Sequence, residues 1–155
     1  MNLSIGDAAP EFSLPDQDGV VHTLSEAQGT WLLLYFYPKD ATPGCTVEAQ
    51  TIRDSWPDFT GSNITVFGIS ADSVASHKKF AEKQGLPFTL LADEKKEMVN
   101  AYGVWGKKKM MGREYDGIFR TSFLVSPDGT IAKIYEQVKP AEHAREVLKD
   151  VAERS

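Results

Sequence analysis

The segment Trp31–Ser55, WLLLYFYPKDATPGCTVEAQTIRDS, joins an apolar run, a short loop and a helix-compatible stretch. An apolar run such as Trp31–Tyr37, ended by a proline, is typical of a central strand that is covered on both faces. The helix-compatible stretch Val47–Ser55 follows the loop and is expected to end before Pro57. The segment therefore predicts a buried strand, a tight loop and a helix, with Cys45 in the first turn of that helix.

Outside this segment, strand signals alternate with helix signals, which predicts an α/β fold with a mixed central sheet flanked by helices. Asp-Gly pairs between apolar stretches predict one hairpin near the N-terminus and another near the C-terminus. The expected strands are residues 12–14, 20–24, 64–70, 88–91, 118–125 and 131–135. The expected helices run from a cap at Asp72 or Ser73 to Gln84, over residues 94–102, and onward from Pro140; residues 104–117 are expected to form a loop.

The 155 residues predict a single domain, 1–155, that is long enough to bury a core. A net charge of −5 gives no reason to expect nucleic-acid binding, and Lys107–Lys109 is expected to be a solvated loop. No apolar run reaches the ~20 residues of a membrane span. Met1–Pro10 contains Asp7 and has no basic start or apolar core, so no secretory signal is predicted. With one cysteine, the composition favours a cytoplasmic protein.

Cys45 is the only cysteine of the sequence. Cysteine reacts as a thiolate, and a helix N-terminus favours an anion through its unpaired N–H groups and its dipole. Making an ordinary thiol mostly thiolate at pH 7 requires about 2.7 kcal/mol, whereas a helix terminus supplies ~0.3–1 kcal/mol. A neighbouring cation is therefore expected if Cys45 is reactive. The alternative is an ordinary buried thiol, and the spacing alone leaves both interpretations open.

The residues around Cys45 suit a binding loop. Pro38 and Pro43 fix φ and stiffen the chain. Gly44 allows the backbone to come close to a molecule beside the sulfur. Thr42 offers a hydroxyl that both donates and accepts hydrogen bonds, which suits a bound oxygen.

The pattern Pro38-xxx-Thr42-xx-Cys45 resembles the active-site signature of the peroxiredoxins. The longer string YPKDATPGCTVEA is similar to the bacterioferritin-comigratory (PrxQ) group. The strings YGVWG at 102–106, FRTSFLV at 119–125 and PDG at 127–129 agree with it in the expected order. The resemblance runs from about Gly6 to the last helix. It implies a thioredoxin-like fold with an N-terminal β-hairpin extension, and a thiol peroxidase that acts on hydrogen peroxide and organic hydroperoxides.

The resemblance also implies roles for individual residues. Arg120 matches the active-site arginine within FRTSF, and apolar residues follow it, where an unpaired arginine is costly. Its permanently charged guanidinium is the expected cation beside Cys45, with a surface ion pair as the alternative. Thr42 is expected to hydrogen-bond the peroxide, aided by the N–H groups of Gly44 and Cys45. Glu48 is expected either to hold the loop or Arg120, or to be a plain first-turn carboxylate.

The sequence departs from much of the group at Gln50, where many members carry a second cysteine. With one cysteine, a disulfide within the chain is impossible, so the sequence predicts a one-cysteine enzyme. Its product, a sulfenic acid on Cys45, is expected to be reduced by thioredoxin, glutaredoxin or glutathione. The expected oligomeric state is a monomer or weak dimer.

Two further functions stay open: a peroxide sensor or redox relay that passes its oxidation to a partner protein, and a non-catalytic scaffold with a buried thiol. No cofactor is expected. His22, His77 and His143 show no metal-ligand spacing, so no metal site is predicted. Four apolar and aromatic residues of the 104–117 loop are expected to cover the core, with a place near the active site or an interface as the alternative: Trp105, Met110, Met111 and Tyr115.

Overall fold

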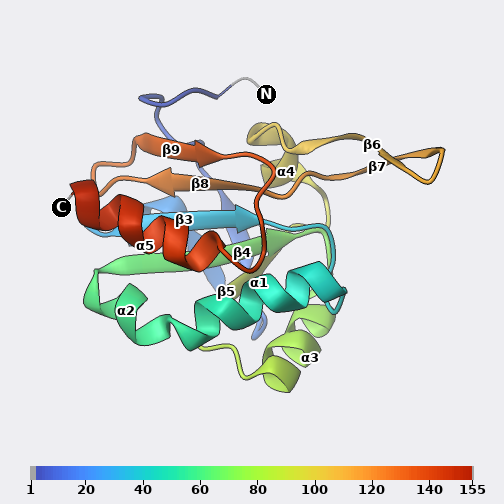
Figure 1. Cartoon of the computed structure of the whole chain (residues 1–155), viewed down its shortest axis with the longest axis horizontal. Coiled ribbons are helices and arrows are strands. Elements are labelled where there is room, and N and C mark those ends of the chain that lie inside the picture. Colours follow the sequence, from blue (N-terminus) through green and yellow to red (C-terminus); the bar gives the residue numbers. More distant parts are fainter. Residues whose placement is uncertain (1–2, 155) are drawn as a thin grey trace.

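The computed structural model describes residues 3–154, apart from the side chain of Met110. At its centre is a mixed five-stranded sheet in the order β5-β4-β3-β8-β9 (Figure 1). The strands are β3 (Trp31–Phe36), β4 (Ile64–Ser70), β5 (Thr89–Ala92), β8 (Thr121–Val125) and β9 (Ile131–Tyr135). β3 pairs in parallel with β4 and antiparallel with β8. The predicted α/β class and mixed sheet are confirmed.

β3 is the central strand because both of its faces are covered. Leu33 and Tyr35 pack into one hydrophobic core, and Leu32, Leu34 and Phe36 pack into a second core on the opposite face. Successive side chains of a strand point to opposite faces, so a strand between two cores must be apolar at every position. This explains the unbroken apolar run that leads to the loop before Cys45.

Helices cover one face of the sheet, and the N-terminal region covers much of the other. The first core takes side chains from α1 (Pro43–Asp54), α2 (Trp56–Gly61), α3 (Val74–Gln84) and α5 (His143–Arg154). The second takes them from the N-terminal segment, the 3-10 helix η1 (Leu24–Ala27) and α4 (Glu97–Ala101). The predicted N-terminal hairpin is present as β1 (Ser13–Pro15) and β2 (Val21–Thr23). Within residues 3–154, no helix has the length and apolar character that a membrane span needs.

The predicted ends of α3 are confirmed. The Ser73 side chain accepts a hydrogen bond from the Ser76 N–H at 3.1 Å, which caps the helix start. At the other end, Gly85 takes the left-handed conformation with φ 62°, as a C-terminal glycine commonly does. The signals for this helix are local in the sequence, which is why they could be read without tertiary information.

The prediction of a loop over residues 104–117 is wrong. The segment forms a β-hairpin of β6 (Trp105–Met110) and β7 (Arg113–Ile118), which projects from the body (Figure 1). The two residues of its turn, Met111 and Gly112, have φ values of 53° and 79°, the signs of a tight hairpin turn. Met-Gly lacks the Asn-Gly or Asp-Gly signature of such turns, and lysine-rich strands exposed to solvent resemble a loop in sequence.

α1 ends at Asp54, before Pro57 as predicted, but a second helix that was not predicted, α2, follows it. Pro57 lies in the first turn of α2, because proline is tolerated at the start of a helix. Other boundaries differ from the prediction. α4 is shorter than residues 94–102, and α5 begins at His143 after a turn at Pro140. Ile118 ends β7, whereas β8 begins at Thr121. Arg120 therefore lies between two strands rather than inside one.

Candidate active site

Cys45 is the third residue of α1 and is only 2% exposed. Thr42 precedes the helix with an extended backbone (φ −84°, ψ 154°), and Pro43 occupies its first turn, as a proline without an N–H group favours. The N–H groups of Gly44 and Cys45 lie in this first turn, so no carbonyl group of the helix accepts a hydrogen bond from them. The predicted placement of the thiol at a helix N-terminus is thus observed.

Strand pairing brings Arg120 to Cys45 from a distant part of the sequence. β8 runs antiparallel to β3, and Thr121 pairs with Phe36 at the end of β3. The residue before β8 therefore lies where the active-site loop begins. Arg120 Nη2 donates to Cys45 Sγ at 3.2 Å. A methyl group on Gly44 would lie 3.1 Å from the same Nη2 atom, so glycine gives the guanidinium room to approach.

Glu48 completes the cluster from one turn farther along α1. Its Oε1 atom accepts from Arg120 Nη1 at 2.7 Å, and its side chain is fully buried. Of the two roles expected for Glu48, the structure thus shows contact with Arg120. Burial raises the pKa of Glu48 to about 7, although the charge of Arg120 opposes this effect. Glu48 Oε2 has no hydrogen-bond partner among the described residues.

Arg120 therefore lies between two groups that can carry negative charge. Burial acts to lower the pKa of Arg120, but the charges of Glu48 and Cys45 outweigh it and raise that pKa. The attraction is mutual, so the same guanidinium favours the anionic form of Glu48. The predicted alternative for Arg120, a surface ion pair, does not describe this buried contact with Cys45 and Glu48.

The other predicted loop residues are close to Cys45 in the sequence, and their side chains differ in exposure. The Thr42 hydroxyl donates to the Lys39 carbonyl at 2.8 Å, so its lone pairs remain as acceptors for another molecule. Pro38 is half-buried after β3, and Pro43 is exposed. Gln50, at the position of a second cysteine in many members of the group, donates to Gln84 Oε1 at 2.9 Å.

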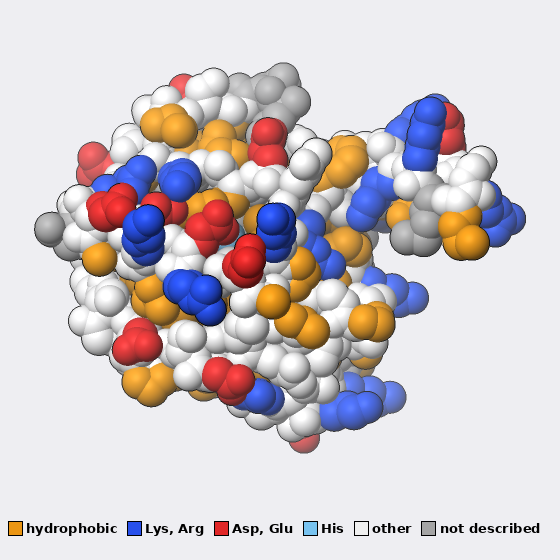
Figure 2. Space-filling view, in the orientation of Figure 1, with side chains coloured by type: hydrophobic (Ala, Val, Ile, Leu, Met, Phe, Trp, Pro, Cys, Tyr) orange, Lys and Arg blue, Asp and Glu red, His pale blue; other side chains and the backbone are white. Residues whose placement is uncertain are grey.

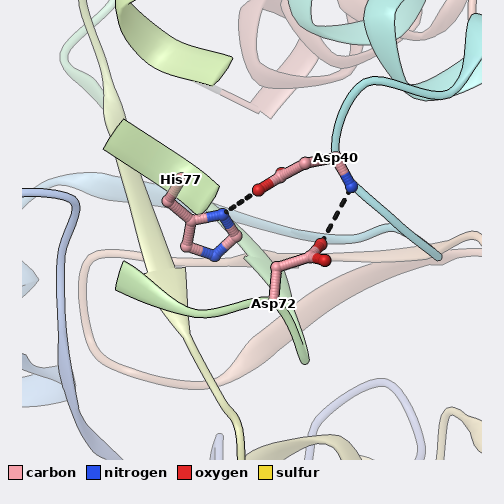
Figure 3. A group of neighbouring side chains, drawn as sticks. All are labelled: Asp40, Asp72 and His77. Atoms are coloured by element: carbon pink, nitrogen blue, oxygen red, sulfur yellow. Dashed lines mark hydrogen bonds and ion pairs between the residues drawn. The ribbon is translucent and has the colours of Figure 1, made fainter. Parts of the chain in front are cut away.

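A second buried cluster, of Asp40, Asp72 and His77, holds the same loop (Figure 3), and no local sequence pattern indicated it. Asp40 Oδ2 lies 2.7 Å from His77 Nδ1, with side chains that are 4% and 0% exposed. Tyr37 and Ser76 donate to Asp40 at 2.5 and 2.8 Å. The Asp40 N–H donates to Asp72 Oδ2 at 2.8 Å. These bonds tie the loop between β3 and α1 to α3 and to the end of β4.

Asp40 and His77 form a close buried contact. His77 Nδ1 faces Asp40 Oδ2, and His77 Nε2 lies 2.9 Å from the Leu91 carbonyl oxygen, so each ring nitrogen has a partner. Burial acts to raise the pKa of Asp40, but the hydrogen bond and charge of His77, with the bonds from Tyr37 and Ser76, lower it.

Ligand atoms of Asp40, Asp72 and His77 lie within 4.8 Å of one another, which is close enough for a metal site. In the described structure, however, hydrogen bonds engage both oxygens of Asp40, one oxygen of Asp72 and both nitrogens of His77. The cluster is therefore satisfied without a cation. It acts as a support for the loop, and the geometry gives no reason to assign a metal to it.

Residues 5–134 match the model of the AhpC/TSA family. The chain belongs to the AhpC/TSA family. It is 47% identical over 146 residues to Peroxiredoxin Bcp of Escherichia coli, which covers 94% of each chain. Its fold is similar to that of a cysteine-to-serine variant of PrxQ from Xylella fastidiosa, with a TM-score of 0.94, 37% identity, and coverage of 99% of this chain and 98% of that one.

The bacterioferritin comigratory protein of Xanthomonas campestris is also similar, with a TM-score of 0.88, 37% identity, and coverage of 96% of this chain and 99% of that one. These findings confirm the resemblance to the PrxQ group and the thioredoxin-like fold. Peroxiredoxins are thiol peroxidases, so this chain is a thiol-dependent peroxidase that uses peroxide and a thiol reductant. The non-catalytic scaffold is thereby excluded.

Proposed function

We propose that the chain reduces hydrogen peroxide and organic hydroperoxides through a sulfenic acid on Cys45, and that an external thiol regenerates the enzyme. The contact of 3.2 Å between Arg120 Nη2 and Cys45 Sγ carries the proposal. The guanidinium stays charged at physiological pH, so it favours the thiolate over the thiol. The position of Cys45 in the first turn of α1 adds to this preference.

Thr42 is proposed to orient the peroxide. Its hydroxyl proton is donated to the Lys39 carbonyl, so its oxygen accepts a hydrogen bond from the O–H of the hydroperoxide. The Arg120 guanidinium and the N–H groups of Gly44 and Cys45 supply donors for the peroxide oxygens. Holding the reactants in one orientation removes an entropic cost from the reaction itself.

In the chemical step, the Cys45 thiolate attacks the terminal peroxide oxygen. An S–O bond forms as the O–O bond breaks, so the sulfur loses the two electrons that the peroxide gains. The leaving oxygen departs as an alkoxide or hydroxide and takes a proton, which gives an alcohol or water. Negative charge moves from the sulfur to the leaving oxygen, and donors already in place, such as Arg120, stabilise that charge. The product on the enzyme is Cys45 sulfenic acid.

Regeneration is proposed to need two thiols from outside the chain, because Cys45 is the only cysteine among the 155 residues. The first thiol condenses with the sulfenic acid, releases water and leaves a mixed disulfide. The second attacks the outer sulfur of this disulfide and restores the Cys45 thiol. Thioredoxin, glutaredoxin and glutathione are the candidate reductants.

The test is peroxide consumption by the purified protein with each reductant supplied in turn. We expect turnover with at least one reductant, and none above background for Cys45→Ser, because serine does not ionise usefully. Circular dichroism of the variant confirms that the fold is retained. Catalytic peroxide consumption by folded Cys45→Ser would contradict the proposal.

A further inference from the structure

Exposed hydrophobic side chains gather on the projecting β6–β7 hairpin and the residue that follows it. Among the described residues, seven large hydrophobic side chains are exposed, and three of them lie within residues 111–119: Met111 at 95%, Tyr115 at 43% and Phe119 at 39%. Met111 lies in the turn and belongs to neither hydrophobic core. Single exposed hydrophobic residues are common on proteins, but a group of them on one projecting element is typical of an interaction site.

The two faces of the hairpin differ in charge. Residues that pair across an antiparallel hairpin point to the same face. On one face, Lys107 lies opposite Asp116 and Lys109 lies opposite Glu114, and the second pair forms an ion pair at 3.7 Å. The charges of this face therefore balance one another.

The other face, which we call the basic aromatic face, carries Lys108, Arg113, Tyr115 and Phe119. Lys108 lies opposite Tyr115, and Arg113 follows the turn on the same side. The Phe119 ring lies on this side too, because a methyl group on Gly106 would be 2.7 Å from it. Arg113 has no ion-pair partner within residues 3–154. This face therefore joins unbalanced positive charge to an aromatic surface.

The hairpin is basic, although the chain as a whole is acidic. Residues 105–118 contain four basic and two acidic residues, a net charge of +2, whereas the whole chain carries −5. Salt screens charges over about 8–10 Å, and a six-residue strand is about 20 Å long. The tip therefore lies beyond the reach of most negative charge on the body. Figure 2 shows basic and hydrophobic side chains together at the end of the hairpin.

We infer that the tip of this hairpin and its basic aromatic face bind the surface of an anionic lipid bilayer. Met111 enters the apolar layer, Tyr115 lies at the level of the headgroups, and Arg113 faces the lipid phosphates. Lys108 donates to the Ile118 carbonyl at 3.0 Å, so it contributes positive potential rather than a contact of its own.

A bilayer suits these side chains better than an acidic protein or a nucleic acid does. All three partners would attract the basic residues, but only a bilayer offers an apolar layer behind a charged surface, which a projecting methionine can enter. Binding of this kind needs no membrane-spanning segment. The inference goes beyond the proposed peroxidase function and does not depend on it.

The test measures sedimentation of the full chain with lipid vesicles. One set contains equal parts of phosphatidylglycerol and phosphatidylcholine, and the other contains phosphatidylcholine alone. We expect the wild type to bind only the anionic vesicles, and high salt to weaken this binding. Met111→Ser should lower the partition coefficient about tenfold through the loss of buried apolar surface, and Arg113→Gln about fivefold through the loss of one charge.

Val20→Ser and Arg145→Gln are the matched controls. Val20 is 57% exposed and lies between β1 and β2, so it is an exposed apolar residue of a different hairpin. Arg145 is an exposed arginine of α5, so its loss changes the charge of the chain as Arg113→Gln does. Both controls should bind vesicles as the wild type does. Consumption of hydrogen peroxide should be the same in all four variants, which shows that each remains folded.

Binding of the wild type to neither kind of vesicle at low salt would overturn the inference. So would a loss of binding in Arg113→Gln without any loss in Met111→Ser, because attraction by charge alone would equally suit an acidic protein or a nucleic acid. An equal loss in Val20→Ser would also overturn it, since the binding surface would then lie outside the β6–β7 hairpin.

A second measurement follows the tip itself. In the Cys45→Ser background, Met111→Cys supplies the only cysteine, which is labelled with a fluorophore whose emission shifts to the blue in an apolar environment. Anionic vesicles should cause this shift, and the same label at Val20→Cys should show none. Protein that sediments with the vesicles while the label at position 111 keeps its emission in water would contradict insertion of the tip. This measurement needs no peroxidase activity, so its result stands even if the proposed function fails.

Discussion

Two buried charged clusters flank the loop between β3 and α1, and they differ in how completely they are hydrogen-bonded. In the Asp40–His77 cluster, both oxygens of Asp40 and both nitrogens of His77 have partners. In the Cys45–Arg120–Glu48 cluster, Glu48 Oε2 has no described partner. The hydroxyl of Tyr35, whose charge interaction with Glu48 and Cys45 places it nearby, is also without one.

This difference indicates that the two clusters have different roles: one supports the loop, and the other takes part in the chemistry of Cys45. A buried polar network with all its bonds made is rigid and holds one conformation. A cluster with unused polar atoms and a raised pKa is typical of a functional site. The first cluster is therefore expected to govern the stability of the loop, and the second to govern the reactivity of Cys45. Variants of each cluster test this separation.

The largest effect is expected for Asp40→Asn. The change replaces the carboxylate oxygen that accepts from Ser76 and faces His77 Nδ1, and each buried polar partner left unsatisfied costs about 1–3 kcal/mol, more for a charged group. Urea unfolding should show this loss, while the rate of Cys45 oxidation in the folded variant stays within about tenfold of wild type. Asp18→Asn is the control, because Asp18 and Lys78 form an exposed pair at 3.5 Å. A rate loss without a stability loss would reverse the assignment.

Arg120→Ala should act mainly on the rate of Cys45 oxidation rather than on stability. Removing the guanidinium takes away the donor on Cys45, and loss of one such donor costs about 100-fold to 1000-fold in rate. The measurement is single-turnover oxidation by hydrogen peroxide at pH 7. Arg53→Ala serves as the control. Arg53 lies on the same helix as Cys45, α1, but it donates to Asp54 and to the Gln84 carbonyl instead. A variant with wild-type oxidation rates would remove Arg120 from the mechanism.

Because of Glu48, the stability of the folded protein should depend on pH. Burial raises the pKa of Glu48 from 4.5 to about 7, so the folded protein binds this proton more tightly than the unfolded chain. Its contribution to stability is fully present below pH 4.5 and is lost as the pH rises through 7, about 3 kcal/mol in all.

The Glu48→Gln variant has no such proton and should not show this loss. Between pH 5 and pH 8, its free energy of unfolding should therefore rise relative to that of the wild type. Parallel curves for the two proteins would show that Glu48 does not titrate in this range.

The smallest effect is expected for Thr42→Val. The variant keeps the branched side chain but loses the oxygen that accepts from the peroxide, which should slow oxidation about tenfold. Thr30→Val is the matched control, because the Thr30 hydroxyl also donates to a nearby carbonyl, that of Ala27, at 2.9 Å. An equal loss of rate in both variants would indicate a general structural effect.

Local patterns were enough to predict much of the fold. The apolar run of β3, the caps of α3 and the position of Cys45 at the start of α1 each depend on neighbouring residues. The active-site motif added Arg120, although its contact with Cys45 depends on the pairing of Thr121 with Phe36, which no local pattern shows.

The remaining features depend on tertiary structure or on unusual local sequence. Asp40 and His77 are 37 residues apart, and their pairing appears only when α3 packs beside the loop. The β6–β7 hairpin lacks both an apolar face and a common turn signature, so its sequence resembles a loop. Lys108 is half-buried, unlike Lys107 and Lys109, because side chains alternate between the two faces of β6.

The most direct test of the central claim is mass spectrometry of the wild-type protein after one equivalent of hydrogen peroxide, without added thiol. If an external thiol regenerates Cys45, the protein should stay a monomer that gains one oxygen atom on Cys45, followed by a second oxygen when more peroxide is added. Addition of a thiol before the second step should restore the starting mass. Complete conversion to a dimer linked through Cys45, with no oxygenated monomer at any time, would contradict regeneration by an external thiol.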